Sequence, residues 1–407
     1  MTDHWTSSEP AIFDRIDAVL DDGKEAVLAT VVDVEGNAYR RPGAKMVVDA
    51  GEGHGSITAG CLEDEVLDLA ERVLESGRPH LETFDLMEDD DVWGLGMGCH
   101  GIVDVLLEPI DSGLRPVVDA YLDGYPVTVL TVLDGFVGDE PASYRGVYRP
   151  GQGFGGEGER EPGGELFARL EPIAASAAAD GASRTVEVDP ADGTPVNATE
   201  GTPVDIADET SVDATAGTTT VFVDGVTPPP ELVVVGAGPD VEPIVDLAAR
   251  NGFRVRVVGY RGGQLDPDRF PTASAVHSTS PRSLLTCHDF DEETYVVVVT
   301  HNYVDDKLTV DALLDTPVPY VALVGARERT ERLLTELHEE RSGLDRSDAE
   351  RIYAPAGLDL GGGSPHQIAT SIVAEAMAVH NDRRPRHLRS RDGPIHERVD
   401  DSQNAST

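Results

Sequence analysis

Two cysteines that each follow a glycine are the residues of this chain best suited to chemistry with sulfur or a soft metal. Gly60-Cys61 stands where helical spacing begins, and a helix N-terminus favours the thiolate that metal binding and sulfur transfer require. Gly98-Cys99 lies among alternating glycines whose backbone N–H groups could converge on an anion. A single thiol is more often a small buried hydrophobe, but together the two mark the first candidate site.

The acidic first domain has its densest positive cluster near these glycine loops. Arg40, Arg41 and Lys45 lie between them and the N-terminus, and guanidinium and ammonium groups suit an anionic ligand. The competing interpretation is ordinary ion pairing with surrounding carboxylates. His100 beside Cys99 is a minor metal-ligand candidate, because a histidine in a loop is more often a hydrogen-bonding surface group.

A second glycine turn, Gly236-Ala-Gly238, follows a run of valines and precedes helical sequence, as phosphate-binding turns do. The dinucleotide pattern is incomplete, because Val241 stands at the third glycine position and Gly259 where an acidic residue would hold a ribose. Asp240, just inside the helix, would repel a phosphate. A nucleotide site and a purely structural turn therefore both remain open.

Two further segments could meet a ligand in the same part of the chain. Thr300-His301-Asn302 ends a predicted strand, at the edge where parallel sheets usually bind ligands. Gly361 opens a run of three glycines before Ser364 and Gln367, which predict a helix capping box. The capping box explains the serine and the glutamine, whereas the glycines would also allow close approach of a ligand.

The predicted strands and helices that carry these residues fall into two regions of the chain, separated by an insertion. The first 150 residues mix strands and helices, with strands predicted at 27–34, 45–48, 56–59 and 102–107 and a helix from Gly60-Cys61 to Gly77. Residues 151–225 change to Gly, Ala, Asp, Glu and Thr, which indicates an acidic insertion or linker with a return strand near 220–224.

Residues 226–380 alternate strands with helices. Strands are predicted at 231–235, 254–259, 295–300 and 320–324, and the alternation is typical of a doubly wound parallel sheet of the Rossmann-like kind. Residues 381–407 mix Arg and Asp and are predicted to be a disordered tail. The fold class is α/β, with a mixed α+β domain followed by a Rossmann-like domain.

Composition excludes several function classes. The chain has 75 acidic against 32 basic residues, a formal net charge of −43 spread along its length, so we expect neither nucleic acid nor an anionic membrane as partner. Such self-repulsion is tolerated where concentrated salt screens it, which indicates a halophile. No secretory signal precedes the first domain, so we expect a cytoplasmic protein. Three scattered cysteines suit neither a disulfide framework nor a zinc site, which needs four close ligands.

The order of motifs resembles the family of xanthine dehydrogenase accessory proteins called XdhC or CoxI. The resemblance spans both domains and departs from the family pattern at His100, Pro239 and Gly259. The residues that carry it are 41–48, 55–63, 96–101 and 106–109 in the first domain, and 229–238, 300–301, 325–327 and 354–361 in the second.

This resemblance implies a maturation factor that is not itself an enzyme. Such a factor binds molybdenum cofactor while a terminal sulfur ligand is installed, and delivers it to an apo molybdenum hydroxylase; a separate cysteine desulfurase supplies the sulfur. A homodimer is the default assembly. The residues expected to bind molybdenum cofactor, or alternatively a nucleotide, are Arg41, Lys45, Gly60, Cys61, Gly98, Cys99, Gly236, Gly238, His301 and Gly361, with Cys61 and Cys99 as candidate metal ligands.

Two other function classes remain. An NAD(P)-dependent oxidoreductase would use the second domain, and it predicts a complete glycine fingerprint and an evident proton donor. A redox or metal-binding regulatory module would need more closely spaced ligands than the sequence offers. Only the cofactor chaperone is supported by motifs in both domains.

Overall fold

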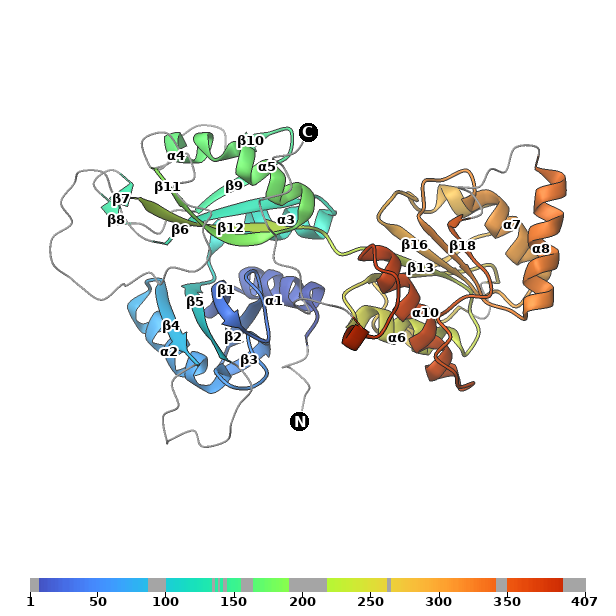
Figure 1. Ribbon diagram of the computed structural model, residues 1–407, viewed down its shortest axis with the longest axis horizontal. Helices are drawn as coiled ribbons and strands as arrows, with labels where there is room; N and C mark the ends of the chain where they lie inside the picture. Colours follow the sequence, from blue (N-terminus) through green and yellow to red (C-terminus); the bar gives the residue numbers. More distant parts are fainter. Residues whose placement is uncertain are drawn as a thin grey trace. The chain divides into compact units, whose positions relative to one another are not determined.

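The computed structural model describes residues 7–86, 100–133, 136–137, 140–141, 145–154, 164–189, 218–261, 265–341 and 350–390. The chain divides into an N-terminal unit, Met1–Pro228, and a C-terminal unit, Pro229–Glu397 (Figure 1). Each unit contains its own β-sheets and its own buried apolar clusters.

The first sheet of the N-terminal unit is antiparallel, in the order β3-β2-β1-β5-β4. Its central strand β1 alternates apolar residues between two covered faces, and α2 packs on one of them over Val27, Val31 and Val105. The helix ends at Gly77, which adopts the left-handed conformation at its C-terminus. The elements are α1 (Glu9–Asp22), β1 (Ala26–Asn37), β2 (Lys45–Asp49), β3 (Glu52–Gly55), α2 (Glu63–Ser76), β4 (His80–Asp85) and β5 (His100–Pro109).

The second sheet of this unit runs in the order β10-β9-β6-β12-β11, and all its pairings are antiparallel. Helix α5 covers one face through small alanine side chains that pack on Leu130, Val221 and Val223. The elements are η2 (Ser112–Leu114), α3 (Arg115–Asp123), β6 (Val127–Val132), β9 (Arg145–Arg149), β10 (Gly153–Phe154), α4 (Gly164–Arg169), α5 (Glu171–Asp180), β11 (Ser183–Val188) and β12 (Thr219–Val226), with β7 (Phe136–Val137) and β8 (Glu140–Pro141) forming a separate hairpin.

Helices α1 and α3 share one apolar cluster with both sheets. Phe13 of α1 stacks on Tyr121 of α3 with ring centroids 3.8 Å apart, and the same cluster includes Leu28 of the first sheet and Val129 of the second. The two sheets are therefore packed into one unit by a common core.

The C-terminal unit is a parallel sheet in the order β15-β14-β13-β16-β17-β18. Its central strands β13, β16 and β17 are buried on both faces, with α6 and α10 over one face of the sheet and α7 and α8 over the other (Figure 1). The elements are β13 (Glu231–Val235), α6 (Val241–Arg250), β14 (Arg254–Gly259), η4 (Pro267–Arg269), β15 (Ala275–Ser278), η5 (Pro281–Thr286), β16 (Thr294–Val298), α7 (Tyr303–Leu313), β17 (Tyr320–Leu323), α8 (Arg327–Glu340), β18 (Ile352–Tyr353), α10 (Pro365–His380) and η6 (Leu388–Ser390).

The predicted α/β class and the doubly wound parallel sheet are confirmed. Two details of the first domain were predicted wrongly. The third strand is Glu52–Gly55 rather than 56–59, and α2 begins at Glu63 rather than at Gly60-Cys61. Both errors have one cause: Thr58 and Glu63 hydrogen-bond to each other, so residues 56–62 form a turn instead of extending either element.

The predicted insertion at 151–225 differs from the structure over part of its length. Helices α4 and α5 and strand β11 occupy residues 164–188, and β12 extends the predicted return strand to Thr219–Val226. The segment contains few large apolar residues because α5 packs through alanines, which resemble a linker in composition. Residues 190–217 lie outside the described part of the chain, as do 391–407 of the predicted tail, whereas residues 381–390 are exposed and include η6.

Candidate functional site

Antiparallel pairing brings several candidate segments to one end of the first sheet. Strand β1 ends there at Asn37, opposite His100, where β5 begins, and β3 ends there at Gly55, opposite Met46 of β2. The loop 38–44, which carries Arg41, returns to the sheet at Lys45, next to the residue opposite Gly55. The Arg41 loop and the turn 56–62, which carries Cys61, therefore lie toward the same end of β2. Ala38 and Cys61 also pack against the same apolar cluster.

Cys61 lies in a turn that is fixed at its base and open at its tip. Ala59 and Gly60 are exposed, and Gly60 has a φ of +102° with open space where a side chain would stand. Cys61 itself is half-buried and reduced, and its N–H donates to the Thr58 hydroxyl at 3.1 Å. The turn therefore presents exposed backbone beside a partly covered thiol.

Arg41 has a half-buried side chain whose Nε is enclosed and has no hydrogen-bond partner among the described residues. Its neighbour Arg40 is exposed. Within the described ranges the Arg41 guanidinium forms no ion pair, whereas Arg15 and Arg145 of the same unit are paired with carboxylates. Arg41 therefore stays a candidate for binding an anion.

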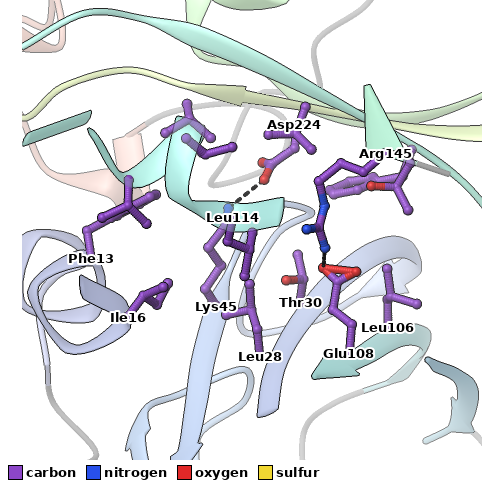
Figure 2. A pocket seen from close by; sticks show the side chains of 16 residues that line it. Phe13, Ile16, Leu28, Thr30, Lys45, Leu106, Glu108, Leu114, Arg145 and Asp224 are labelled. Atoms are coloured by element: carbon purple, nitrogen blue, oxygen red, sulfur yellow. Dashed lines mark hydrogen bonds and ion pairs between the residues drawn. The ribbon is translucent and has the colours of Figure 1, made fainter. Parts of the chain in front are cut away.

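Lys45 does not share that availability, and here the prediction needs correction. Its Nζ lies 2.7 Å from Asp224 Oδ2 and 3.0 Å from Gly43 O, and the lysine and aspartate side chains are each 8% exposed. Figure 2 shows Lys45 pointing from the first sheet toward Asp224, with the Arg145–Glu108 ion pair beside it. Lys45 is engaged in an ion pair because the facing β12 carries a buried acid.

The space around these ion pairs is too small for an organic cofactor. Apolar side chains from both sheets line a cavity of about 30 Å³, which has room for about two water molecules. Its charged walls are already paired with one another (Figure 2). The cavity is a small internal space between the two sheets and is not a cofactor site.

Gly98 and Cys99 lie outside the described residues, as does the side chain of His100. The backbone of His100 begins β5 directly opposite Asn37. Cys99 immediately precedes this strand in sequence.

In the C-terminal unit the structure brings together Gly236, Gly238 and His301. β13 and β16 are neighbours in the centre of the sheet, and the chain leaves them toward opposite edges, which creates the usual ligand crevice of such folds. His301 follows β16 with a φ of +57°, a conformation that costs energy for a residue with a side chain. Its ring lies about 3.5 Å from the place where a Cβ on Gly238 would stand.

The surroundings of Gly238 do not fit a dinucleotide. A Cβ there would collide with the Asp240 carboxylate, whose Oδ2 lies 2.8 Å from His301 Nε2. Arg269 donates to the carbonyls of Ala237 and Gly238 at 2.9 and 3.1 Å, so the guanidinium beside this turn is already engaged. A carboxylate therefore stands where a pyrophosphate would have to approach the turn.

The position where the ribose of a dinucleotide would bind does not fit that ligand either. Gly259 ends β14 where a carboxylate would bind the ribose hydroxyls, and the apolar Leu265 packs over it within 2.9 Å of a Cβ position. The glycines of this crevice are explained by close packing against Val299, His301 and Leu265.

Gly361 lies in an exposed loop with a φ of +73°. The predicted capping box follows it: Gln367 N–H donates to Ser364 Oγ, and the Gln367 side chain accepts from Ser364 N–H at 3.1 Å. Ligand binding is therefore not needed to explain either Ser364 or Gln367.

Three functional candidates escaped the sequence analysis. Asp306, 1% exposed, accepts from the Thr300 hydroxyl and pairs with Arg329, which fixes the end of β16 beside His301. Burial raises the pKa of Asp306, while Thr300 and Arg329 oppose that rise. Thr58 and Glu63 are the others, and their only sequence signal is a hydroxyl and a carboxylate flanking Gly60-Cys61.

Within the described ranges, no cluster of three or more His, Cys, Asp or Glu side chains could hold a metal ion. No helix in that part of the chain is long and apolar enough to cross a membrane.

Comparison with family models matches residues 19–85 to the XdhC and CoxI family and residues 232–376 to the XdhC Rossmann domain. A Bacillus subtilis protein whose name describes it as a probable xanthine dehydrogenase component is 30% identical over 368 residues, which cover 89% of this chain and 95% of that protein. The Escherichia coli protein named molybdenum cofactor insertion chaperone PaoD is 23% identical over 388 residues, which cover 93% of each chain.

A solved structure shares the architecture. The crystal structure of a Bacillus halodurans protein described as a xanthine dehydrogenase superposes with a TM-score of 0.68 and 26% identity, covering 91% of this chain and 96% of that one. The similarity thus spans both units.

Proposed function

Because this chain belongs to the XdhC and CoxI family, we propose that it is a non-catalytic accessory protein that binds molybdenum cofactor and delivers it to a xanthine-dehydrogenase-type molybdenum hydroxylase. The name of the Escherichia coli relative, a molybdenum cofactor insertion chaperone, supports the same role. The cofactor is cargo here, so no chemical step is assigned to the chain.

The observation that supports the proposal is that the loop carrying Arg41 and the turn carrying Cys61 lie toward the same end of β2 in the first sheet. A pterin phosphate needs a cation and backbone N–H groups, and a soft metal centre suits a thiol. Arg41 would hold the phosphate, the exposed Gly60 backbone would approach it, and Cys61 would lie toward the metal. Gly98 and Cys99, which precede β5 in sequence, are proposed to complete this site.

The finer steps belong to the same proposal. As the family resemblance implies, the chain protects the cofactor while a separate cysteine desulfurase supplies the terminal sulfur ligand, and it releases the cargo to the apo hydroxylase. The proposal also keeps the homodimer, the default assembly, and the cytoplasm, which the polar N-terminus favours. The acidic surface suits a cytoplasm rich in salt.

The C-terminal unit carries the other residues that the sequence analysis proposes for cofactor binding. His301, Gly236, Gly238 and Gly361 remain candidate contacts for the cofactor, but Asp240 beside Gly238 argues against a dinucleotide there. Oxidoreductase activity, the alternative function, is disfavoured for the same reason.

The test is purification in high salt from a host that makes molybdenum cofactor, followed by assay of bound molybdenum and pterin and of NAD(P)H binding. We expect co-purified molybdopterin and no nicotinamide binding. Tight NAD(P)H binding without pterin would replace the proposal by the oxidoreductase.

Cysteine variants refine this test. Cys61→Ala and Cys99→Ala should each lower cofactor content and activation of the apo hydroxylase. Cys287→Ala is the matched control, because that thiol lies in the C-terminal unit and donates to Leu284 O. If both test variants retain as much cofactor as the control, the thiols are not part of the site.

A further inference from the structure

Glu63 is a buried carboxylate at the start of α2, and its two oxygens are both used. The residue is 2% exposed. Its Oε1 accepts from Thr58 N–H at 2.9 Å, and its Oε2 accepts from the Thr58 hydroxyl and from Leu62 N–H at 3.1 Å. A buried carboxylate is tolerated only with such partners, so the bonds are required wherever this charge is buried.

These bonds do more than begin a helix. The residue at the N-cap position is Leu62, whose side chain cannot cap, and Glu63 accepts from the Leu62 N–H, one of the N–H groups that a helix start leaves open. Glu63 therefore reaches backwards across the turn and, with Thr58, closes a ring from residue 58 to residue 63.

Thr58 connects that ring to the thiol. A hydroxyl has one proton and two lone pairs, and donation of the proton to Glu63 leaves the lone pairs for the N–H groups of Cys61 and Leu62, at 3.1 and 3.3 Å. Ala59 and Gly60 between them are exposed, and a side chain at Gly60 would meet open space. The backbone of Cys61 is therefore fixed from Thr58, and Thr58 from Glu63.

We propose that Glu63, acting through the Thr58 hydroxyl, is a positioning residue that fixes the Cys61 thiol at the cofactor site. That the fixed thiol contacts the cofactor rests on the proposed function, whereas the fixing of the thiol itself does not. Glu63 touches no ligand in this proposal.

The experiment measures the rate at which iodoacetamide alkylates Cys61 in the cofactor-free, full-length protein, followed by mass spectrometry of the Cys61 peptide. Glu63→Gln keeps the shape but removes the second acceptor oxygen, and Thr58→Val removes the hydroxyl. Both should change the rate by roughly threefold or more, the effect of losing about one hydrogen bond. Thr58→Ser restores the hydroxyl and should return the wild-type rate.

Glu65→Gln is the matched control, because it removes the same charge from the first turn of α2 at an exposed position. Wild-type rates in both Glu63→Gln and Thr58→Val would overturn the proposal, as would failure of Thr58→Ser to restore the rate. Melting temperatures are measured in parallel. If Glu63→Gln does not fold, the comparison of Thr58→Ser with Thr58→Val still decides; if Thr58→Val does not fold, the comparison of Glu63→Gln with Glu65→Gln does.

Cofactor content of the same variants separates the two proposals. A changed alkylation rate with lowered molybdenum content supports both. A changed rate with unchanged molybdenum content supports the positioning of Cys61 and overturns its assignment as a cofactor contact.

Discussion

Lys45 Nζ lies 2.7 Å from Asp224 Oδ2, and the pair joins the two sheets of the N-terminal unit where both side chains are 8% exposed. Ser183 donates to the other oxygen of Asp224 at 2.8 Å. Lys45→Met would leave that carboxylate buried with one hydroxyl, so the free energy of unfolding should fall by about 3–5 kcal/mol. Urea denaturation measures it.

The double variant Lys45→Met/Asp224→Leu is the control for this prediction. It removes both charges and should be clearly more stable than Lys45→Met alone, because no unpaired charge remains buried. A loss below about 1 kcal/mol in the single variant would show that the pair behaves like an exposed one.

Substitution of Arg41 should weaken cofactor binding and leave stability nearly unchanged, whereas substitution of Lys45 should lower stability. Arg41→Gln should reduce cofactor retention roughly tenfold, the value of one charge-assisted contact, while the free energy of unfolding stays close to wild type. Molybdenum content of the purified protein and urea denaturation provide the two readouts. Arg78→Gln, at an exposed position after α2, is the control. Equal retention in the two variants would remove Arg41 from the site.

Asp240 should keep nucleotides out of the C-terminal unit. We expect NADH fluorescence titration of the wild type to show no binding below about 1 mM, and Asp240→Ala to bind more tightly because the carboxylate beside Gly238 is gone. Asp246→Ala changes the same charge at an exposed position of α6 and should leave binding unchanged. Micromolar binding by the wild type would contradict the role given to Asp240.

His380 should make the C-terminal unit less stable in weak acid. Burial lowers the pKa of its imidazole from the ordinary 6.5, against a smaller opposing effect of Glu293, and Nδ1 lies 3.1 Å from the Tyr295 hydroxyl. The folded protein thus binds this proton less tightly than the unfolded chain. The stabilisation is complete above pH 6.5 and is lost as the pH falls from 6.5 toward the lowered pKa.

Urea midpoints measured between about pH 7 and pH 5 test this dependence. His380→Gln should flatten the decline, since glutamine can accept from Tyr295 and does not titrate. The exposed His387 provides the control variant His387→Gln, which should retain the wild-type slope. A wild-type slope in His380→Gln would show that other groups cause the decline.

The sequence predicted the C-terminal unit better than the N-terminal one. Strands such as Glu231–Val235 and Thr294–Val298 are continuous apolar runs, because helices cover both faces of the parallel sheet. The short edge strands β15 and β18 were missed, since two to four partly exposed residues carry no clear period. Helix α5 was missed because its alanines resemble a linker.

The sequence shows which residue types could form the candidate site, but it does not show which side chains pair with one another. Glycine spacing and the Cys61 thiol stand out in the sequence, and sheet topology then brings the Cys61 turn to the end that carries Arg41. The engagement of Lys45 depended on Asp224, far away in sequence, and no local pattern records such a pairing. The Asp240–His301 contact depended likewise on the neighbouring positions of β13 and β16.

Strands β11 and β12 pair antiparallel with Val188 directly opposite Thr219, so the long segment that joins them begins and ends at adjacent points of one sheet. A connection of any length from a tight turn upward closes this gap without shifting the register, and the entropy of closing a loop grows only slowly with its length. The fold therefore places little restraint on how many residues are inserted here. Evolution can lengthen, shorten or recharge this stretch independently of the sheets, which makes it the natural position for adaptation to a changed environment or partner.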